Sequence, residues 1–506
     1  MIVVCEPGRV GARRRPAPAR LRFAPMGLLV GDVIRHAARV VPGRLAATMG
    51  ADELTFGQLE VESNQVARAL AARGVGRGDR VAWWGETGLE AMPIFGALAK
   101  LGAAFMPVNA RLSVDEASEV IGYARPRLTV VDAAHEGAGF EFLRQGELVG
   151  DAARSEGGDV VDPALDELDT HVVFFTSGST GRSKGVVLSH RCSYLRSFPN
   201  LITDWEGGTV CMFPLFHMSG WSMTLNAWQM RLPVHFSSAD AGVLLETAQR
   251  RRASRLYCLP AVWDRVLAHG HAGYDLGSVR ECDTGTSATP PELLAAIKAA
   301  FPGTVTRIYY GSTEAGPATL LGDVDLARKP GSVGLPAPGV DLRLSEEGEV
   351  CVRSEFLMDG YFEQPEATAS ALQDGWYHTG DLGALDDEGY VSIVGRARDV
   401  LRTGGETVSP GEVERVLAAH PAVAEVAVVG LPDVRWGDVV CAVVVPAAGR
   451  AGELSVESLR AHCDGRLATF KQPRRLEVVE ALPRTPATGQ VQRTLLVERL
   501  SSPGRN

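Results

Sequence analysis

The residues best suited to chemistry lie in one short run, Thr176-Ser-Gly-Ser-Thr-Gly-Arg-Ser-Lys-Gly185. Small residues let the backbone approach a ligand closely, and successive N–H groups in such a turn can surround an anion. Hydroxyl groups add hydrogen-bond donors, and the Lys184 ammonium adds a mobile positive charge. The run therefore predicts a loop that binds phosphate oxygens, with a flexible Gly/Ser linker as the plain alternative.

Apolar residues flank this loop, from His171 to Phe175 before it and from Val186 to Leu188 after it, which predicts strand, loop, strand. A Walker A loop needs Gly-Lys followed by Ser or Thr at the start of a helix. No lysine in the chain follows a glycine, so this is a phosphate loop of another kind.

Strand and helix patterns alternate ahead of the loop, from about residue 28 to residue 161. Arg80–Trp84, Ala103–Val108 and Arg127–Asp132 are predicted to be strands, with a helix over Glu90–Leu101 between the first two. Strands separated by helices favour a largely parallel sheet that is covered on both faces. The predicted fold class is therefore α/β.

The overall composition limits the binding partners and the cellular location that we expect for the protein. The 506 residues, 45% of them apolar, are enough for more than one domain. A net charge of −10 gives no sign of a nucleic-acid partner, and no apolar run nears the roughly 20 residues that cross a bilayer. Eight scattered cysteines without a C-x-x-C pair predict reduced thiols and a cytoplasmic location.

The first 26 residues differ from the rest, because arginine alternates with proline and alanine there. No apolar core follows these arginines, so the segment does not match a secretory signal. We expect a disordered tail over residues 1–26, with Met26 as a second possible start of translation.

The phosphate loop T-S-G-S-T-G-x-x-K-G resembles the signature of the adenylate-forming superfamily, which includes acyl- and aryl-CoA synthetases, luciferases and peptide-synthetase adenylation domains. The family's later motifs follow in order, at Tyr310-Gly-Ser-Thr-Glu314, Trp376-Tyr-His-Thr-Gly-Asp381 and Gly395-Arg-Ala-Arg-Asp399. The resemblance implies a large N-terminal domain of two mixed or parallel sheets flanked by helices, with a small β-barrel-like subdomain. A small mobile α/β lid would follow, which places the adenylation domain at residues 27–396 and the lid at 397–506.

The resemblance also implies a nucleotide site. Tyr310 would stack on adenine, Thr313 would bond the α-phosphate, and Glu314 would hold Mg²⁺. Asp381 would accept hydrogen bonds from the ribose hydroxyls, and Arg396 would contact ribose or phosphate. These assignments agree with the chemistry, because a hard cation prefers carboxylate oxygens and an aromatic face suits a purine. The full implied nucleotide-binding set is Thr176, Ser177, Gly178, Ser179, Thr180, Gly181, Gly285, Thr286, Ser287, Tyr309, Tyr310, Gly311, Asp381 and Arg396, and the implied catalytic set is Lys184, His217, Thr313, Glu314 and Gln490.

The segment Pro214-Leu-Phe-His217-Met-Ser-Gly220 resembles the family's P-L-F-H-x-x-G, whose histidine lies at the entrance of the acyl pocket. Met218 and Trp221 are then expected as pocket walls. The segment lacks the aspartate that pairs an α-ammonium in peptide-synthetase domains, so a fatty or aryl acid is favoured over an α-amino acid. The family usually has two glycines where this chain has Gly285-Thr286, so we expect less backbone freedom at Thr286.

One departure from the family concerns its last motif, P-x-x-x-x-G-K. The corresponding residue here is Gln490, in a segment one residue longer, and no lysine follows Lys471. A neutral amide cannot cancel charge at the reacting phosphate, an effect worth roughly 2–4 kcal/mol. Adenylation should then slow about a hundredfold or more, unless Arg484, Arg493 or Lys471 supplies the charge.

The predicted function is ATP-dependent activation of a carboxylic acid through an acyl-adenylate, with ATP, Mg²⁺ and coenzyme A as cofactors. Two alternatives stay open. The first is altered chemistry on the same fold, such as transfer to a carrier protein or an amine, or activation of an oxyanion such as nitrite. The second is a nucleotide-binding pseudoenzyme. The sequence leaves the acid, the final acyl acceptor and the oligomeric state open.

Overall fold

The computed structural model describes residues 27–137, 140–176, 184–198, 206–403, 406–433, 436–485 and 489–501. Five predicted loop residues, Ser177, Gly178, Ser179, Thr180 and Gly181, lie outside this part of the chain, as does the N-terminal segment 1–26.

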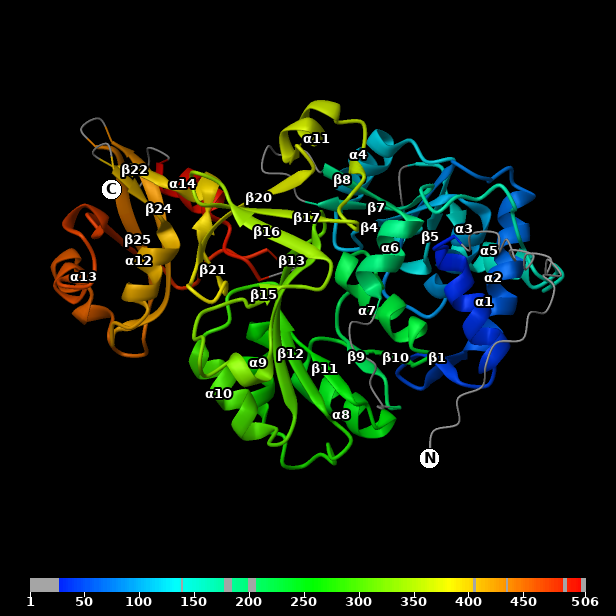
Figure 1. Cartoon of the computed structure of the whole chain (residues 1–506), viewed down its shortest axis with the longest axis horizontal. Helices are drawn as coiled ribbons and strands as arrows, with labels where there is room; N and C mark the ends of the chain where they lie inside the picture. Colours follow the sequence, from blue (N-terminus) through cyan, green and yellow to red (C-terminus); the bar gives the residue numbers. More distant parts are fainter. Residues whose placement is uncertain are drawn as a thin grey trace, which may run out of the picture.

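A nine-stranded sheet forms one side of the large N-terminal region (Figure 1). Its strands in spatial order are β15 (Leu335–Pro336), β14 (Gly316–Leu321), β13 (Val305–Ser312), β12 (Glu281–Gly285), β11 (Arg255–Tyr257), β9 (Thr209–Cys211), β10 (Val234–Phe236), β1 (Leu45–Met49) and β2 (Asp52–Thr55). The six strands from β13 to β1 run parallel, and β14, β15 and β2 are added antiparallel at the ends.

A seven-stranded sheet forms the other side. Its order is β18 (Gly360–Tyr361), β8 (Lys184–Ser189), β7 (Thr170–Thr176), β4 (Ala104–Val108), β3 (Arg80–Trp84), β5 (Leu128–Val131) and β6 (Leu143–Arg144). Every residue of β4 is buried, as expected for a parallel strand covered on both faces. The predicted strands on either side of the phosphate loop are confirmed as β7 and β8.

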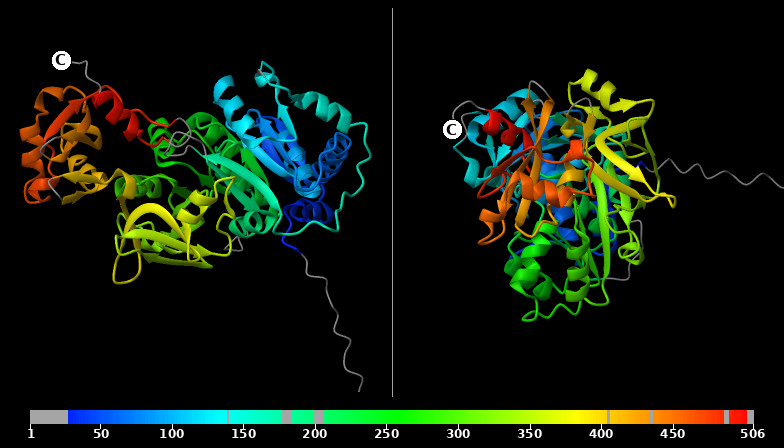
Figure 2. Two further views of the ribbon diagram at one scale, coloured as in Figure 1. Left: turned by 90° about the horizontal axis from the view of Figure 1, so that it is seen from above. Right: turned by 90° about the vertical axis from the view of Figure 1, so that its left-hand side faces the viewer.

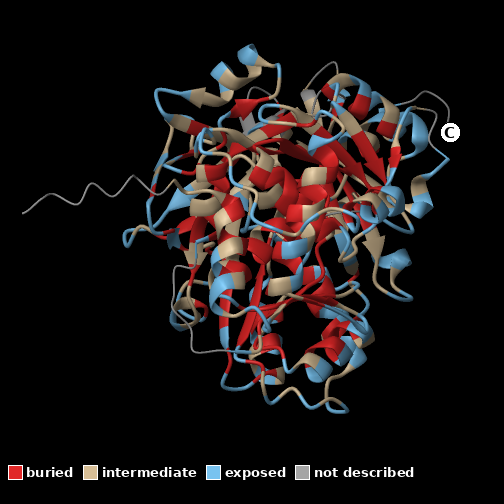
Figure 3. Ribbon diagram, turned by 90° about the vertical axis from the view of Figure 1, so that its right-hand side faces the viewer, coloured by how far each residue is buried: buried red, intermediate tan, exposed pale blue. Residues whose placement is uncertain are grey.

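Helices cover these sheets and fill the space between them. α6 packs on β7 and β8 while α7 packs on β9 and β10, and the two helices contact each other, so they lie between the sheets. The helices of this region are α1 (Val30–Val40), α2 (Phe56–Ala71), α3 (Ala91–Leu101), α4 (Val114–Ala124), α5 (Gln145–Ala152), α6 (His190–Ser197), α7 (Met218–Gln229), α8 (Ala241–Arg251), α9 (Pro260–His269), α10 (Pro291–Ala300) and α11 (Pro365–Ala371), with short 3₁₀ turns at Ala133–His135 and Asp323–Asp325. Buried residues gather along the sheets, and exposed residues lie on the outer helices (Figure 3).

A third sheet is antiparallel and consists of β16 (Val340–Leu344), β17 (Glu349–Ser354), β20 (Trp376–Leu385), β19 (Leu372–Gln373) and β21 (Val391–Arg396). Within the described residues β16 pairs only with β17, so the sheet is open where the sequence predicted a barrel-like subdomain. A bulge between Leu382 and Gly383 interrupts the pairing of β20 with β21, which adds local twist to the hairpin.

The C-terminal residues form a separate small α/β unit at one end of the molecule (Figure 2). A short 3₁₀ turn at Ala397–Asp399 leads into it from β21. Its sheet contains β23 (Glu406–Val408), β22 (Leu401–Thr403), β25 (Gly437–Pro446), β24 (Val423–Asp433) and β26 (Arg475–Val478). Its other elements are α12 (Pro410–Leu417), α13 (Val456–Cys463) and α14 (Arg493–Ser501), with 3₁₀ turns at Ala451–Glu453 and Thr469–Lys471. Valines alternate between the two faces of the β24–β25 hairpin, and each face has its own apolar cluster.

The cysteines of the described residues are free and buried. They are Cys192, Cys211, Cys258, Cys282, Cys351, Cys441 and Cys463. Burial raises the pKa of each thiol, because a thiolate would lose its hydration there. Each helix in the described ranges is too short or too polar to cross a membrane.

Candidate active site

A cleft of about 2920 Å³ is lined by residues from three parts of the molecule. These parts are the region of the two large sheets, the antiparallel sheet and the C-terminal unit. Most of the predicted site residues line the cleft. They are Thr176, Lys184, His217, Met218, Thr286, Ser287, Tyr309, Tyr310, Gly311, Thr313, Glu314, Asp381, Arg396 and Gln490. Residues that are far apart in the sequence therefore meet around one opening.

The two ends of the phosphate loop are held together by the sheet. Thr176 ends β7 and Lys184 begins β8, and the two residues are paired across the antiparallel ladder. The Thr176 hydroxyl donates to the Lys184 carbonyl over 3.4 Å. This pairing fixes where the loop leaves and rejoins the cleft wall.

Tyr361 links the Lys184 and Glu314 side chains. The Lys184 Nζ lies 4.7 Å from the Tyr361 ring centroid, and the Tyr361 hydroxyl donates to Glu314 Oε1 over 3.0 Å. Strand β18 places Tyr361 beside β8, because Tyr361 pairs with Val186. No local pattern in the sequence identifies Tyr361, since the contact depends on strand pairing between segments 175 residues apart.

The turn that carries Thr313 and Glu314 is braced by another residue that the sequence did not identify. Arg196, near the end of α6, donates to the Thr313 carbonyl over 2.8 Å and to the Phe356 carbonyl over 2.6 Å. The Glu314 carbonyl accepts from the Met358 N–H over 2.8 Å. These bonds leave the Glu314 carboxylate facing the cleft, where an oxygen ligand suits a hard cation such as Mg²⁺.

Asp381 lies between Tyr310 and Arg396. Its Oδ2 accepts from the Tyr310 hydroxyl over 2.7 Å, and its Oδ1 pairs with the Arg396 Nε over 2.7 Å. Burial, and then the neighbouring Asp381 carboxylate, raise the pKa of Tyr310, so this phenol stays protonated. A carboxylate held in this way, with an aromatic ring beside it, fits a ribose and its base.

The Glu349 carboxylate forms a second set of polar contacts with β20, the strand that carries Asp381. Glu349 Oε1 accepts from the Gly380 N–H over 2.7 Å, and its Oε2 bonds with His378 Nδ1 over 2.8 Å. The Cys351 Sγ lies 3.6 Å from the same nitrogen, so the fold brings one cysteine into a set with metal-ligand chemistry that the sequence spacing did not predict. Because His378 and Gly380 are on the same strand as Asp381, their bonds with Glu349 hold the backbone next to it.

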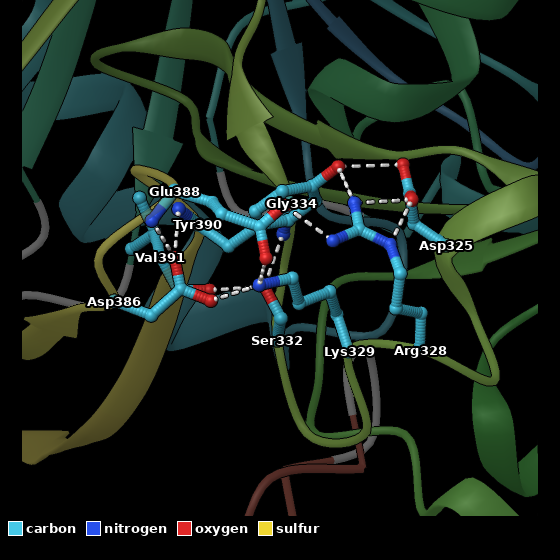
Figure 4. Close-up of polar contacts among 9 residues, drawn as sticks. All are labelled: Asp325, Arg328, Lys329, Ser332, Gly334, Asp386, Glu388, Tyr390 and Val391. Atoms are coloured by element: carbon cyan, nitrogen blue, oxygen red, sulfur yellow. Dashed lines mark hydrogen bonds and ion pairs between the residues drawn. The ribbon is translucent and has the colours of Figure 1, made fainter.

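The turn between β20 and β21 is tied to the segment that connects β14 and β15 of the nine-stranded sheet (Figure 4). Lys329 pairs with Asp386 and Glu388 at 2.6 and 2.5 Å, and its Nζ lies 4.7 Å from the Tyr390 ring centroid. Arg328 donates to the Tyr390 hydroxyl over 2.8 Å. Because Asp381 and Arg396 are opposite each other on this hairpin, the network also fixes the strands that present them.

The segment Gly285-Thr286 combines a tight approach with a strained backbone. A Cβ at Gly285 would lie 2.3 Å from the Tyr309 carbonyl oxygen, so no larger residue fits. Thr286 has a φ of 71°, in the left-handed region that β-branched residues rarely adopt. The expected loss of backbone freedom is therefore visible as a threonine that holds a conformation suited to glycine.

His217 begins α7 at the edge of the cleft, and its Nδ1 accepts from the Ser219 N–H over 3.2 Å. Burial lowers the pKa of His217 to about 4, so the imidazole is neutral at pH 7. Met218 also lines the cleft. Trp221, expected as a pocket wall, is instead packed in the core, because its ring stacks on Phe95 at 3.8 Å and its Nε1 donates to the Leu215 carbonyl.

Gln490 is exposed on the C-terminal side of the cleft. Its backbone bonds with Thr485 on both sides, which closes the turn that carries it. Two of the cations named as replacements for the usual lysine also line the cleft, but both are paired. Arg484 bonds with the Gly489 carbonyl and Glu425, and Arg493 holds Glu414 at 2.7 Å and Asp399 at 3.4 Å.

Lys471, the third candidate, pairs with Glu412 at 2.6 Å and does not line the cleft. The structure therefore brings Gln490, Arg484 and Arg493 to the cleft but not Lys471.

Comparison with known proteins matches two family models, "AMP-binding enzyme" over residues 34–362 and "AMP-binding enzyme C-terminal domain" over residues 412–488. Feruloyl-CoA synthase from Amycolatopsis is 34% identical over 88% of this chain and 94% of its own length. The long-chain-fatty-acid–CoA ligase FadD13 of Mycobacterium tuberculosis is 33% identical over 94% and 99%. The o-succinylbenzoate coenzyme A synthetase MenE of Bacillus subtilis, solved with ATP and a magnesium ion, superimposes with a TM-score of 0.81 at 26% identity, covering 92% of this chain and 98% of that one.

Both matched models, near full-length relatives and the cleft built from the shared motifs lead to the same assignment. The chain belongs to the AMP-binding enzyme family, the adenylate-forming enzymes to which acyl- and aryl-CoA ligases belong.

Proposed function

We propose that the protein is an ATP-dependent acid–CoA ligase that forms AMP. A carboxylate oxygen of the acid attacks the α-phosphate of ATP, pyrophosphate leaves, and the acyl-adenylate then passes its acyl group to the thiol of coenzyme A with release of AMP. The observation that carries the proposal is the meeting of Lys184, Glu314 and Asp381 around one cleft.

Each of these residues has a role that its contacts support. Asp381 and Tyr310 hold the nucleoside, Lys184 balances phosphate charge, and Glu314 supplies an oxygen ligand for Mg²⁺. When bound, Mg²⁺ neutralises charge on the phosphates. His217, neutral and fixed by Ser219, orients the acid at the start of α7 without adding charge.

The C-terminal unit is proposed to act as a lid, with residues 27–396 as the adenylation domain and 397–506 as the lid. The 3₁₀ turn after Arg396 is the short connection between them, and Arg493 reaches across it to Asp399. A change in orientation at this connection would exchange the residues facing the nucleotide between the two half-reactions. An acyl carrier protein is the second candidate for the acyl acceptor.

With Gln490 in place of the family's lysine, we expect the first half-reaction, formation of the acyl-adenylate, to be slower. The cations beside it in the described chain are engaged by Glu425, Glu414 and Asp399, so replacing the missing charge would require breaking an ion pair. The same arrangement is also compatible with altered chemistry on the same fold and with a nucleotide-binding pseudoenzyme.

The test is pyrophosphate release by the full chain with ATP and Mg²⁺ across a panel of aryl and fatty acids, with AMP and loss of free CoA thiol measured in parallel. We expect acid-dependent pyrophosphate and CoA-dependent AMP. Asp381→Ala is the control for the nucleotide site: it removes a carboxylate proposed to hold the nucleoside and should weaken nucleotide binding. Nucleotide binding without acid-dependent pyrophosphate from any acid would overturn the proposal and favour a pseudoenzyme.

A further inference from the structure

Four charged side chains lie together on the nine-stranded sheet, and three of them, Arg255, Glu281 and Arg307, line the cleft. Arg255 is on β11, Glu281 and Asp283 are on β12, and Arg307 is on β13; together they form the charged cluster. In the parallel register Arg255 is opposite Glu281, and Asp283 is opposite Arg307. Side chains two residues apart share a face, so the cluster lies on the same face as Gly285.

The charged cluster is buried and internally balanced. The Asp283 side chain is fully buried, and it pairs with the Nε of Arg255 at 2.7 Å and the Nε of Arg307 at 2.9 Å. Glu281 pairs with Arg307 and lies 3.6 Å from the Arg255 Nε. Burial opposes the charge of Arg255, but the adjacent carboxylates outweigh it and raise the pKa of Arg255. Two guanidinium groups thus face two carboxylates, with no net charge.

Arg255 has donors to spare. Among the hydrogen bonds of the described residues it uses only Nε, and neither Nη1 nor Nη2 donates to any described group. Its side chain keeps 17% exposure and lines the cleft. Its guanidinium carbon lies 5.6 and 5.8 Å from the ring centroids of Tyr257 and Tyr309. Buried donors without partners are costly, so a site that keeps them accessible from a cleft is suited to a ligand.

Arg255 lines the same cleft as one face of α7. Met218, Ser222, Asn226 and Met230 follow at four-residue spacing and line the helical wall of the cleft. The opposite wall contains Thr286, just after β12, and Tyr257 and Arg255, which are two residues and about 7 Å apart on β11. An acid whose carboxylate lies near His217 and Thr286 would therefore place its far end beside Arg255.

We propose that Arg255 binds an uncharged oxygen, a hydroxyl, keto or amide group, at the far end of the acid. The substrate class is then hydroxylated or oxo-substituted acids rather than plain fatty acids. This inference rests on the proposed function. An uncharged oxygen is favoured over a second carboxylate because the charged cluster is already neutral, and a further anion would be close to Asp283 and Glu281.

The experiment is calorimetric binding of three matched acids to the full chain saturated with AMP. The acids are 3-phenylpropanoic acid and its 4-hydroxy and 4-carboxy derivatives. We expect the hydroxylated acid to bind at least about tenfold more tightly than the unsubstituted one, because a buried donor rejects an analogue that leaves it unpaired. Arg255→Met should bring this ratio close to one, and Arg255→Lys should restore part of it.

Arg250→Met is the control, because Arg250 is exposed on α8 and pairs there with Glu246. It should leave the ratio unchanged. An AMP-induced rise in Tm confirms that Arg255→Met still folds its nucleotide site, and Arg255→Lys carries the test if it does not.

Equal binding of the hydroxylated and unsubstituted acids, tighter binding of the carboxylated acid, or a ratio that survives in Arg255→Met would each overturn the inference. The outcome is separate from that of the proposed function, because binding needs no turnover. Selective binding without pyrophosphate release would defeat only the proposed function. Turnover of all three acids at similar efficiency would defeat only this inference.

Discussion

The two walls of the cleft hold their charges in different ways. On the large N-terminal wall, Asp283 is fully buried between Arg255 and Arg307. On the C-terminal wall, the side chains of Arg484 and Glu425 keep 45% and 46% of their exposure. Buried ions lose hydration and persist only with close partners, whereas exposed pairs contribute little. The charges of the cluster are therefore buried within the sheet, whereas the Arg484–Glu425 pair lies half exposed on the surface.

The largest expected effect concerns Asp283. Asp283→Asn leaves two buried guanidinium groups short of a carboxylate, and we expect a loss of about 3–5 kcal/mol in unfolding free energy. Urea unfolding followed by circular dichroism measures it. Asp341→Asn is the control, because Asp341 forms an exposed pair with Arg353. Equal losses in both variants would erase the distinction between buried and exposed charge.

Glu314 and Gln490 allow the same comparison for catalysis. Glu314→Gln keeps the shape but removes the charge, and we expect pyrophosphate release to fall by about 10² to 10³. Gln490→Ala removes only an exposed amide and should cost less than about tenfold. Rates at saturating Mg²⁺ and ATP decide between them. If Gln490→Ala were the more damaging change, the C-terminal wall would carry the chemistry.

Acid should destabilise the N-terminal region through three buried histidines, His171, His190 and His235. Burial lowers the pKa of His190 and of His235 to about 4 and that of His171 well below its usual value. Histidines of the unfolded chain bind protons near pH 6.5, whereas in the folded chain His190 and His235 do so only near pH 4 and His171 only well below its usual range. Stability should therefore fall with pH through this window, by about 1.4 kcal/mol per unit for each histidine.

Urea midpoints at pH 7, 6 and 5 measure this slope, and His235→Gln should reduce it. A slope that His235→Gln leaves unchanged would contradict the assignment.

A smaller effect is expected from adding charge to the C-terminal wall. Gln490→Lys should raise acid-dependent pyrophosphate release about ten- to a hundredfold, since a cation can offset charge at the phosphate. Thioester formation from supplied acyl-adenylate should stay within about twofold. Gln490→Met is the size-matched control without charge. No gain from lysine would mean that this wall already delivers a cation from elsewhere.

The smallest effect is expected for Glu425→Gln, which breaks the pair with Arg484. Both side chains are about half exposed, so the loss in unfolding free energy should be under about 1 kcal/mol. Added salt should change the stability of the wild type and of this variant almost equally. A loss as large as that of Asp283→Asn would show that exposure does not separate the two walls.

Local patterns predicted the elements that are apolar and bounded by turn residues. Arg80–Trp84 is a strand with the predicted limits, and α2 begins one residue after Thr55, which forms a capping box with Gln58. Each of these two signals is contained within a few neighbouring residues. The described residues that the motifs assign to a nucleotide site line one cleft, apart from Gly285, and their role in binding nucleotide stays a prediction.

The charged cluster was not predicted, because charged residues such as Glu281 and Asp283 do not form the apolar run that marks a buried strand. Glu281 and Asp283 are in fact in β12, where partners on β11 and β13 stabilise polar residues in a buried strand. Tyr361 was missed for the same reason. Such contacts depend on the register between strands distant in sequence, which no local pattern encodes.

The buried thiols have a practical consequence. Since burial keeps the seven described cysteines protonated, thiol-directed dyes should react with them slowly. With Cys5, which lies outside the described residues, replaced, one new surface cysteine on each wall would offer a nearly silent background for a donor and an acceptor dye. Energy transfer between the dyes would then report how far apart the walls are at each stage of turnover.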